Sequence, residues 1–160
     1  MKKYAWLFSV SFVVLVVDQL AKIWAHARLL RDRIIFEGDF LQLGYAENRA
    51  AALGLFSNVP ENFRVPLFHF VSFGAVVLVL YYASRLSGAA NELFVKWGLP
   101  LVLGGALGNE VDRLFRGYVI DFIDFHPGGW QWPAFNVADA AIVTGMVLLI
   151  VDSMIRPAKR

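Results

Sequence analysis

Several long stretches of this 160-residue chain carry almost no charge. Residues 65–84 contain only His69 as a side chain that can be charged near neutral pH, and residues 130–151 contain only Asp139. A helix that crosses a bilayer needs about 20 mostly apolar residues. The sequence therefore predicts a mainly α-helical membrane protein. Its four transmembrane helices are expected at about residues 4–25, 65–84, 93–115 and 134–155.

Composition agrees with this prediction and argues against other classes. Apolar residues make up 58% of the chain and charged residues 18%, against roughly 45–50% and about 25% in soluble domains. A formal net charge of +2 without a long basic run argues against a nucleic-acid partner. The lack of cysteine excludes a disulfide scaffold and a thiol nucleophile. The length predicts one domain, residues 1–160.

The first apolar stretch has a competing explanation as a cleaved secretory signal. Lys2 and Lys3 precede it, and residues 25–27 have the A-x-A form of a signal-peptidase site. However, Asp18 and Lys22 lie between the apolar run and that site, spaced as a pair on one helix face. A secretory signal has no need for such a pair, so we expect a retained anchor.

Two polar segments, at about residues 26–64 and 116–133, connect the predicted helices. In the first, short apolar runs flank residues 37–39, a pattern typical of a β-hairpin. Pro60, with Asn58 as a cap, indicates the start of a short helix. In the second segment, residues 118–125 are typical of a strand. Four crossings place both segments on the same side of the membrane, and the lysine and arginine counts favour cytoplasmic termini.

Polar side chains in the apolar stretches gather near the ends that join these two segments. An ionisable residue inside a transmembrane helix is costly and is a functional candidate by default. Independent structural accidents would have scattered such residues over both ends. The groups are Asp18 with Lys22, Asn109 with Asp112 and Arg113, Asp121 with Asp124, and Asn136 with Asp139.

Most of these residues also have a purely structural explanation. Asp18 and Lys22 can neutralise each other, and Arg113 can reach the lipid headgroups with Asp112 as its partner. Asn136 can cap a helix or bond between helices.

Asp139 is harder to explain in this way, because no basic residue lies within four positions of it. A buried carboxylate needs a partner from elsewhere or must hold a proton. Asp121 is the natural partner, because a short loop returns the chain from it to the last helix. Two aspartates sharing one proton can activate water and polarise a carbonyl group.

Other chemistries lack their residues. The three histidines form no H-E-x-x-H pair, and no G-x-S-x-G motif occurs. A zinc protease and a serine mechanism are therefore not expected, and a reaction carried by an aspartate pair requires no metal and no cofactor. Residues 104–108 fit the small-residue pattern of close helix packing, without a function of their own.

Five motifs in order resemble those of bacterial lipoprotein signal peptidase, also called signal peptidase II, and they cover nearly the whole chain. They are residues 18–22 (DQLAK), Asn48 before residues 50–52 (AAA), residues 105–113 (GALGNEVDR), residues 117–122 (GYVIDF) and residues 133–139 (PAFNVAD). Two departures from the family pattern stand out. Residues 49–53 read RAAAL where the family usually has x-Gly-Ala-Ala-Phe, and Glu110 stands where an apolar residue is usual.

This resemblance implies a four-helix aspartic endopeptidase of the bacterial inner membrane, with cytoplasmic termini and its site near the periplasmic face. It also implies a small periplasmic β-cradle and a short periplasmic helix. Its substrates would be prolipoproteins carrying diacylglycerol on a cysteine, cleaved just before that cysteine to release the signal peptide. Membrane lipids and inhibitors of the globomycin type would be its other partners, and we expect a monomer.

The resemblance further assigns site residues. Asp121 and Asp139 would form the catalytic pair. The residues that bind substrate or support the site would be Asn48, Asn109, Arg113, Asn136, Asp18 and Lys22.

Two other functions stay open at this stage. A small transporter or channel could use Asp139, Asp112 and Arg113 as an ion or proton relay. A membrane scaffold without catalytic activity could bury the same ion pairs.

Overall fold

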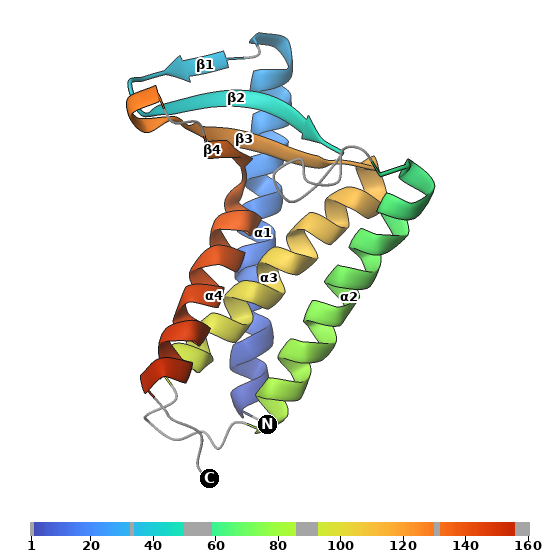
Figure 1. The fold of residues 1–160 in the computed structure, drawn as a ribbon, viewed down its shortest axis with the longest axis vertical. Coiled ribbons are helices and arrows are strands. Elements are labelled where there is room, and N and C mark those ends of the chain that lie inside the picture. Colours follow the sequence, from blue (N-terminus) through green and yellow to red (C-terminus); the bar gives the residue numbers. More distant parts are fainter. Residues whose placement is uncertain (1, 33, 50–58, 86–92, 130–131, 156–160) are drawn as a thin grey trace.

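The computed structural model describes residues 2–32, 34–49, 59–85, 93–129 and 132–155. A bundle of four helices carries a four-stranded sheet at one end (Figure 1). The helices are α1 (Lys2–Asp32), α2 (Glu61–Arg85), α3 (Leu93–Arg116) and α4 (Val137–Ile155). The start of α1 and the end of α4 lie at the end of the bundle away from the sheet.

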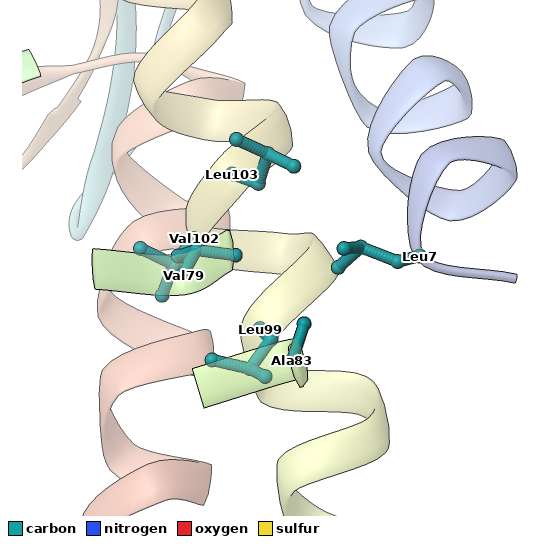
Figure 2. Packing of buried hydrophobic residues seen from close by; sticks show 6 residues of the cluster. All are labelled: Leu7, Val79, Ala83, Leu99, Val102 and Leu103. Carbon is teal, nitrogen blue, oxygen red and sulfur yellow. The ribbon is translucent and has the colours of Figure 1, made fainter. Parts of the chain in front are cut away.

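Helix α3 is the central element of the bundle and packs against α1, α2 and α4. Its apolar face meets α1 and α2 in a buried cluster that includes Leu7, Val79, Leu99 and Leu103 (Figure 2). Pro100 interrupts the hydrogen-bond ladder of α3, because proline has no N–H to offer the carbonyl of Lys96. The Trp6 indole of α1 donates to that carbonyl instead, over 3.2 Å.

Glycines allow α3 to approach its neighbours closely. A Cβ on Gly105 would lie 2.4 Å from the carbonyl oxygen of Ala138 on α4, and one on Gly104 would lie 2.7 Å from that of Ser11 on α1. Neither position has room for a larger side chain. The small-residue packing predicted for residues 104–108 is confirmed.

Three of the described helices are long and apolar enough to cross a membrane. The stretches are Tyr4–Leu29, Asn62–Arg85 and Val137–Ile155. Helix α3 has similar length but carries five charged side chains. Its central position surrounds it with the other three helices, and many of its residues are buried.

The sheet has the order β1-β2-β3-β4, with every neighbouring pair antiparallel. The strands are β1 (Ile34–Glu37), β2 (Leu41–Asn48), β3 (Val119–Phe125) and β4 (Trp132–Phe135). The predicted hairpin and the predicted strand at residues 118–125 are both confirmed. A second buried cluster, which includes Ala25, Leu29, Ile120 and Phe122, fastens β3 to the upper part of α1.

At three places the helices begin or end elsewhere than the predicted stretches. Helix α1 continues past residue 25 to Asp32, because its last turns pack against the sheet. The last helix begins at Val137 and not at residue 134, because the preceding residues form β4. The helical turn predicted at Pro60 does not open a separate helix. It is the start of α2, with the Pro60 carbonyl accepting from Phe63. Asn58, its predicted cap, lies outside the described residues.

Candidate active site

The start of α4 fixes the Asp139 carboxylate in place. The Asn136 side-chain oxygen accepts from the Asp139 backbone N–H at 2.9 Å, and Asp139 Oδ2 accepts from the Asn136 backbone N–H at 3.2 Å. This reciprocal pair is a capping box, in which the residue before a helix and the third helical residue satisfy each other. The cap uses Oδ2 of Asp139, and Oδ1 accepts a hydrogen bond from the neighbouring helix α3.

Asp121 comes to the same place from the middle of β3. Its Oδ1 accepts from the Asn136 side-chain amide at 2.7 Å, and its Oδ2 accepts from the Asn48 amide of β2 at 2.8 Å. Asn136 therefore bonds both aspartates. Its side-chain amide donates to Asp121, and its backbone N–H and side-chain oxygen form the capping box with Asp139. Asp121 is almost completely buried. Burial, followed by the nearby charge of Asp139, raises the pKa of Asp121 to about 7.

Asn109 on α3 holds the remaining oxygen of Asp139. Its Nδ2 donates to Asp139 Oδ1 at 2.7 Å. Its Oδ1 accepts from Lys22 at 3.0 Å and from the Asn136 amide at 3.2 Å. The side-chain oxygen of Asn109 already accepts from two donors, so the amide is oriented with its N–H₂ group toward Asp139.

Lys22 and Asp18 of α1 lie fully buried behind the asparagines. The Lys22 ammonium lies 2.9 Å from Asp18 and 3.0 Å from Asp112. Asp18 Oδ1 also accepts from the backbone N–H of Ala138 at 2.8 Å, in the first turn of α4. An anion is favourable at that end of a helix, because the first N–H groups point toward it. The predicted pair therefore also joins α1 to α4.

Asp112 anchors the strand that carries Asp121. Its Oδ2 accepts from the backbone N–H of Ile120 at 3.1 Å, and its Oδ1 accepts from Arg116 and from Gln19. Helix α3 can turn directly into β3 because Gly117 adopts a φ of 76°, a left-handed conformation that closes helices. The sequence marks Asp112 as a polar residue near the end of an apolar stretch. Its contact with the backbone of β3 cannot be predicted from residue spacing, because it depends on how the strand lies against α3.

Arg113 has Glu110 as its ion-pair neighbour. Asp112, which the structural explanation of the sequence paired with Arg113, forms its ion pairs with Lys22 and Arg116. The Arg113 guanidinium lies 4.0 Å from Glu110 and 5.2 Å from the centre of the Phe68 ring. The charges of Asp139 and Asp121 also act on it.

The structure thus brings together residues from all the predicted groups. Asp121, Asp139, Asn48, Asn109 and Asn136 form one continuous hydrogen-bonded set. Lys22 and Asp18 extend this set into α1, and Arg113 follows Asn109 by one turn of α3. Within the described residues, no group of three or more His, Asp or Glu side chains has the arrangement of a metal site.

Sequence comparison identifies the family. The sequence model described as Signal peptidase (SPase) II matches residues 10–155. The chain belongs to the signal peptidase II family. Its members are peptidases, and the matched residues 10–155 include every residue of the hydrogen-bonded set.

Known relatives are similar over almost their whole length. A lipoprotein signal peptidase of Janthinobacterium sp. (strain Marseille) is 36% identical over 154 residues, which cover 96% of this chain and 90% of the relative. One of Burkholderia mallei (strain SAVP1) is 39% identical over 151 residues, covering 94% and 88%. A solved structure described as a bacterial membrane enzyme superposes with a TM-score of 0.77 at 26% identity, covering 96% of this chain and 92% of that one.

Proposed function

We propose that this protein is an aspartic endopeptidase that removes the signal peptide from diacylglyceryl-modified prolipoproteins by cleaving just before the lipidated cysteine. The observation that carries the proposal is the bonding of Asn136 to both Asp121 and Asp139, which come from a strand and a helix. Family membership supports the substrate class, since the similar proteins are named lipoprotein signal peptidases.

The reaction needs one ionised and one protonated carboxyl group. The ionised aspartate takes a proton from water, whose oxygen attacks the scissile carbonyl carbon while the protonated aspartate gives its proton to the carbonyl oxygen. The resulting diol collapses when the aspartate that took the water proton gives it to the amide nitrogen and the other aspartate takes a proton back from a diol hydroxyl. The C–N bond then breaks, and the carboxyl pair returns to its starting state. A pKa of about 7 for Asp121 supports a shared proton at neutral pH.

The surrounding residues hold this pair in position. Asn48, Asn109 and Asn136 donate to the carboxylate oxygens. We assign Arg113 to binding of the substrate backbone. Lys22 and Asp18 fix Asn109 and the start of α4, and correct orientation accounts for a large part of enzymatic rate enhancement.

We further propose that α3 is a fourth span and that the sheet rests on the periplasmic face of the inner membrane, with both termini in the cytoplasm. The diacylglyceryl chains of a substrate stay in the outer leaflet, so the bond to be cut lies near that interface. The carboxyl pair lies at the sheet end of α4, which supports a site at that interface. One chain supplies all the residues of the proposed site, and we propose that the protein acts as a monomer. Inhibitors of the globomycin type would compete for the pair.

The proposal is tested by cleavage of a lipidated prolipoprotein peptide in detergent or lipid. We expect Asp121→Asn and Asp139→Asn each to lower the cleavage rate roughly 100- to 10,000-fold, since each removes one proton-transfer group. Globomycin should inhibit the wild-type protein.

A matched control uses the other acid of the same strand. Asp124→Asn should keep most of the activity, because Asp124 has no contact with the hydrogen-bonded set among the interactions of the described residues. Rapid cleavage by a correctly folded Asp121→Asn or Asp139→Asn protein would overturn the aspartic mechanism. Ion or solute flux without any peptide product would instead indicate a transporter.

A further inference from the structure

Two consecutive residues of α2 lie against the same part of α3. The ring of Phe68 lies under the Arg113 guanidinium, 5.2 Å from ring centre to carbon. The ring of His69 reaches Glu110, with Nδ1 bonded to Oε1. An ionised carboxylate can only accept hydrogen bonds, so Nδ1 carries the proton in this contact.

Glu110 connects these two contacts. One of its oxygens receives the His69 bond, and the other, Oε2, is buried and lies 4.0 Å from the Arg113 guanidinium. Within the described residues, this second oxygen has no hydrogen-bond donor. An ion-pair partner is therefore the interaction that offsets its burial, and Arg113 is that partner.

We infer that Phe68, His69 and Glu110 form a clamp by which α2 positions the Arg113 guanidinium beside the aspartate pair. The inference rests on the proposed function, because it gives α2 a part in the same site. Further along the two helices, α2 packs on α3 through apolar side chains that include Val79 and Leu99. Arg113 is placed one helical turn beyond Asn109, which bonds Asp139.

The charges around Arg113 explain why such a clamp is needed. Four carboxyl groups act on its guanidinium, those of Glu110, Asp139, Asp112 and Asp121. Without Glu110, the attraction of the aspartate pair would draw the flexible arginine side chain toward the carboxylates that must receive water. Glu110, held by His69 and opposite the Phe68 ring, keeps the guanidinium at a fixed distance from them.

The first measurement reads the arginine itself and needs no activity. Phenylglyoxal modifies accessible arginines, and mass spectrometry of peptides gives the rate for Arg113 alone. We expect about tenfold faster modification of Arg113 in His69→Leu and Glu110→Gln than in the wild-type protein. His69→Asn should restore slow modification, because its side-chain amide can place an N–H near the position of Nδ1.

The second measurement is the pH profile of prolipoprotein cleavage. In Glu110→Gln, kcat/KM should fall about tenfold, and the decline of activity at high pH should begin at a lower pH. The decline begins at a lower pH because the positive charge of Arg113, no longer opposed by Glu110, favours the ionised form of Asp121. In an Arg113→Gln background, Glu110→Gln should change both quantities much less, because the residue through which it acts is gone.

Tyr82→Phe is the control on α2. Tyr82 is exposed and lies outside the site, so this variant should match the wild-type protein in both measurements. Unchanged Arg113 modification in His69→Leu and Glu110→Gln would overturn the clamp, as would equal effects of Glu110→Gln with and without Arg113. A wild-type protein that cleaves no prolipoprotein but shows the expected modification rates would instead overturn the proposed function and leave the clamp in place.

Discussion

Asn136 combines two roles, one as a helix cap and one as a hydrogen-bond donor between elements. It caps α4 with its side-chain oxygen and donates from its side-chain nitrogen to Asp121, Asn109 and the Ile120 carbonyl. The spacing of Asn136 and Asp139 on one helix end could be read from the sequence. The bond to Asp121 could not, because it depends on how β3 passes the start of α4.

The raised pKa of Asp121 has a consequence for stability. The folded protein binds this proton more tightly than the unfolded chain, whose carboxyl titrates near 3.8. The stabilisation is fully present below that value and is lost as the pH rises through about 7. Between pH 5 and pH 8, the free energy of unfolding of the wild-type protein should therefore fall by about 3 kcal/mol more than that of Asp121→Asn.

Unfolding of both proteins in mixed detergent micelles at the two pH values measures this difference. Each protein is compared with itself, so the hydrogen bonds that asparagine changes affect both of its values equally. The same pH dependence in the two proteins would contradict the assignment of a retained proton to this site.

At the scale of elements, α3 and α4 position the site through close backbone contact. Gly98 and Gly145 face each other, and a Cβ on Gly98 would lie 2.9 Å from the Gly145 carbonyl oxygen. The small-residue pattern on α3 predicted close packing from the sequence. It did not identify the neighbour of each glycine, because Gly104 faces α1 while the next residue faces α4.

Gly105→Ala should therefore lower both activity and stability. Its methyl group would meet the Ala138 carbonyl at 2.4 Å and force α4 away from α3, which moves Asp139 relative to Asn109. We expect at least a tenfold loss of cleavage, since displacements of about 1 Å have such effects, and a lower melting temperature in detergent. Gly74→Ala on α2 is the matched control, because its added carbon has no heavy atom within 4 Å. Equal behaviour of the two variants would contradict the close packing.

At the scale of the whole molecule, apolar stretches predicted the helices well, and alternating short runs predicted the hairpin and β3. They did not predict β4, since residues 132–135 are apolar and continuous with the last span. Side-chain pairings between distant residues could not be predicted either, because they depend on how the elements are placed relative to one another. His69 with Glu110, for example, joins two helices whose relative rotation no periodicity in either one determines.

The proposed orientation can be tested directly, because the chain contains no cysteine. Asp39 is exposed in the turn between β1 and β2, and Arg85 is exposed at the far end of α2. In intact spheroplasts, a membrane-impermeant maleimide should label Asp39→Cys and spare Arg85→Cys until the membrane is opened. Labelling of Arg85→Cys alone before opening would reverse the orientation.

The pairing of Lys22 with Asp18 inside α1 also bears on how the protein is made. Its other partners, Asp112 and Asn109, belong to a helix that the ribosome produces much later. During that interval the nascent first helix carries its own counter-ion one turn away, so it can enter the lipid without an isolated charge. Once α3 is made, Lys22 contacts Asp112 and Asn109 in addition to Asp18. The site is therefore complete only when both halves of the chain have entered the membrane.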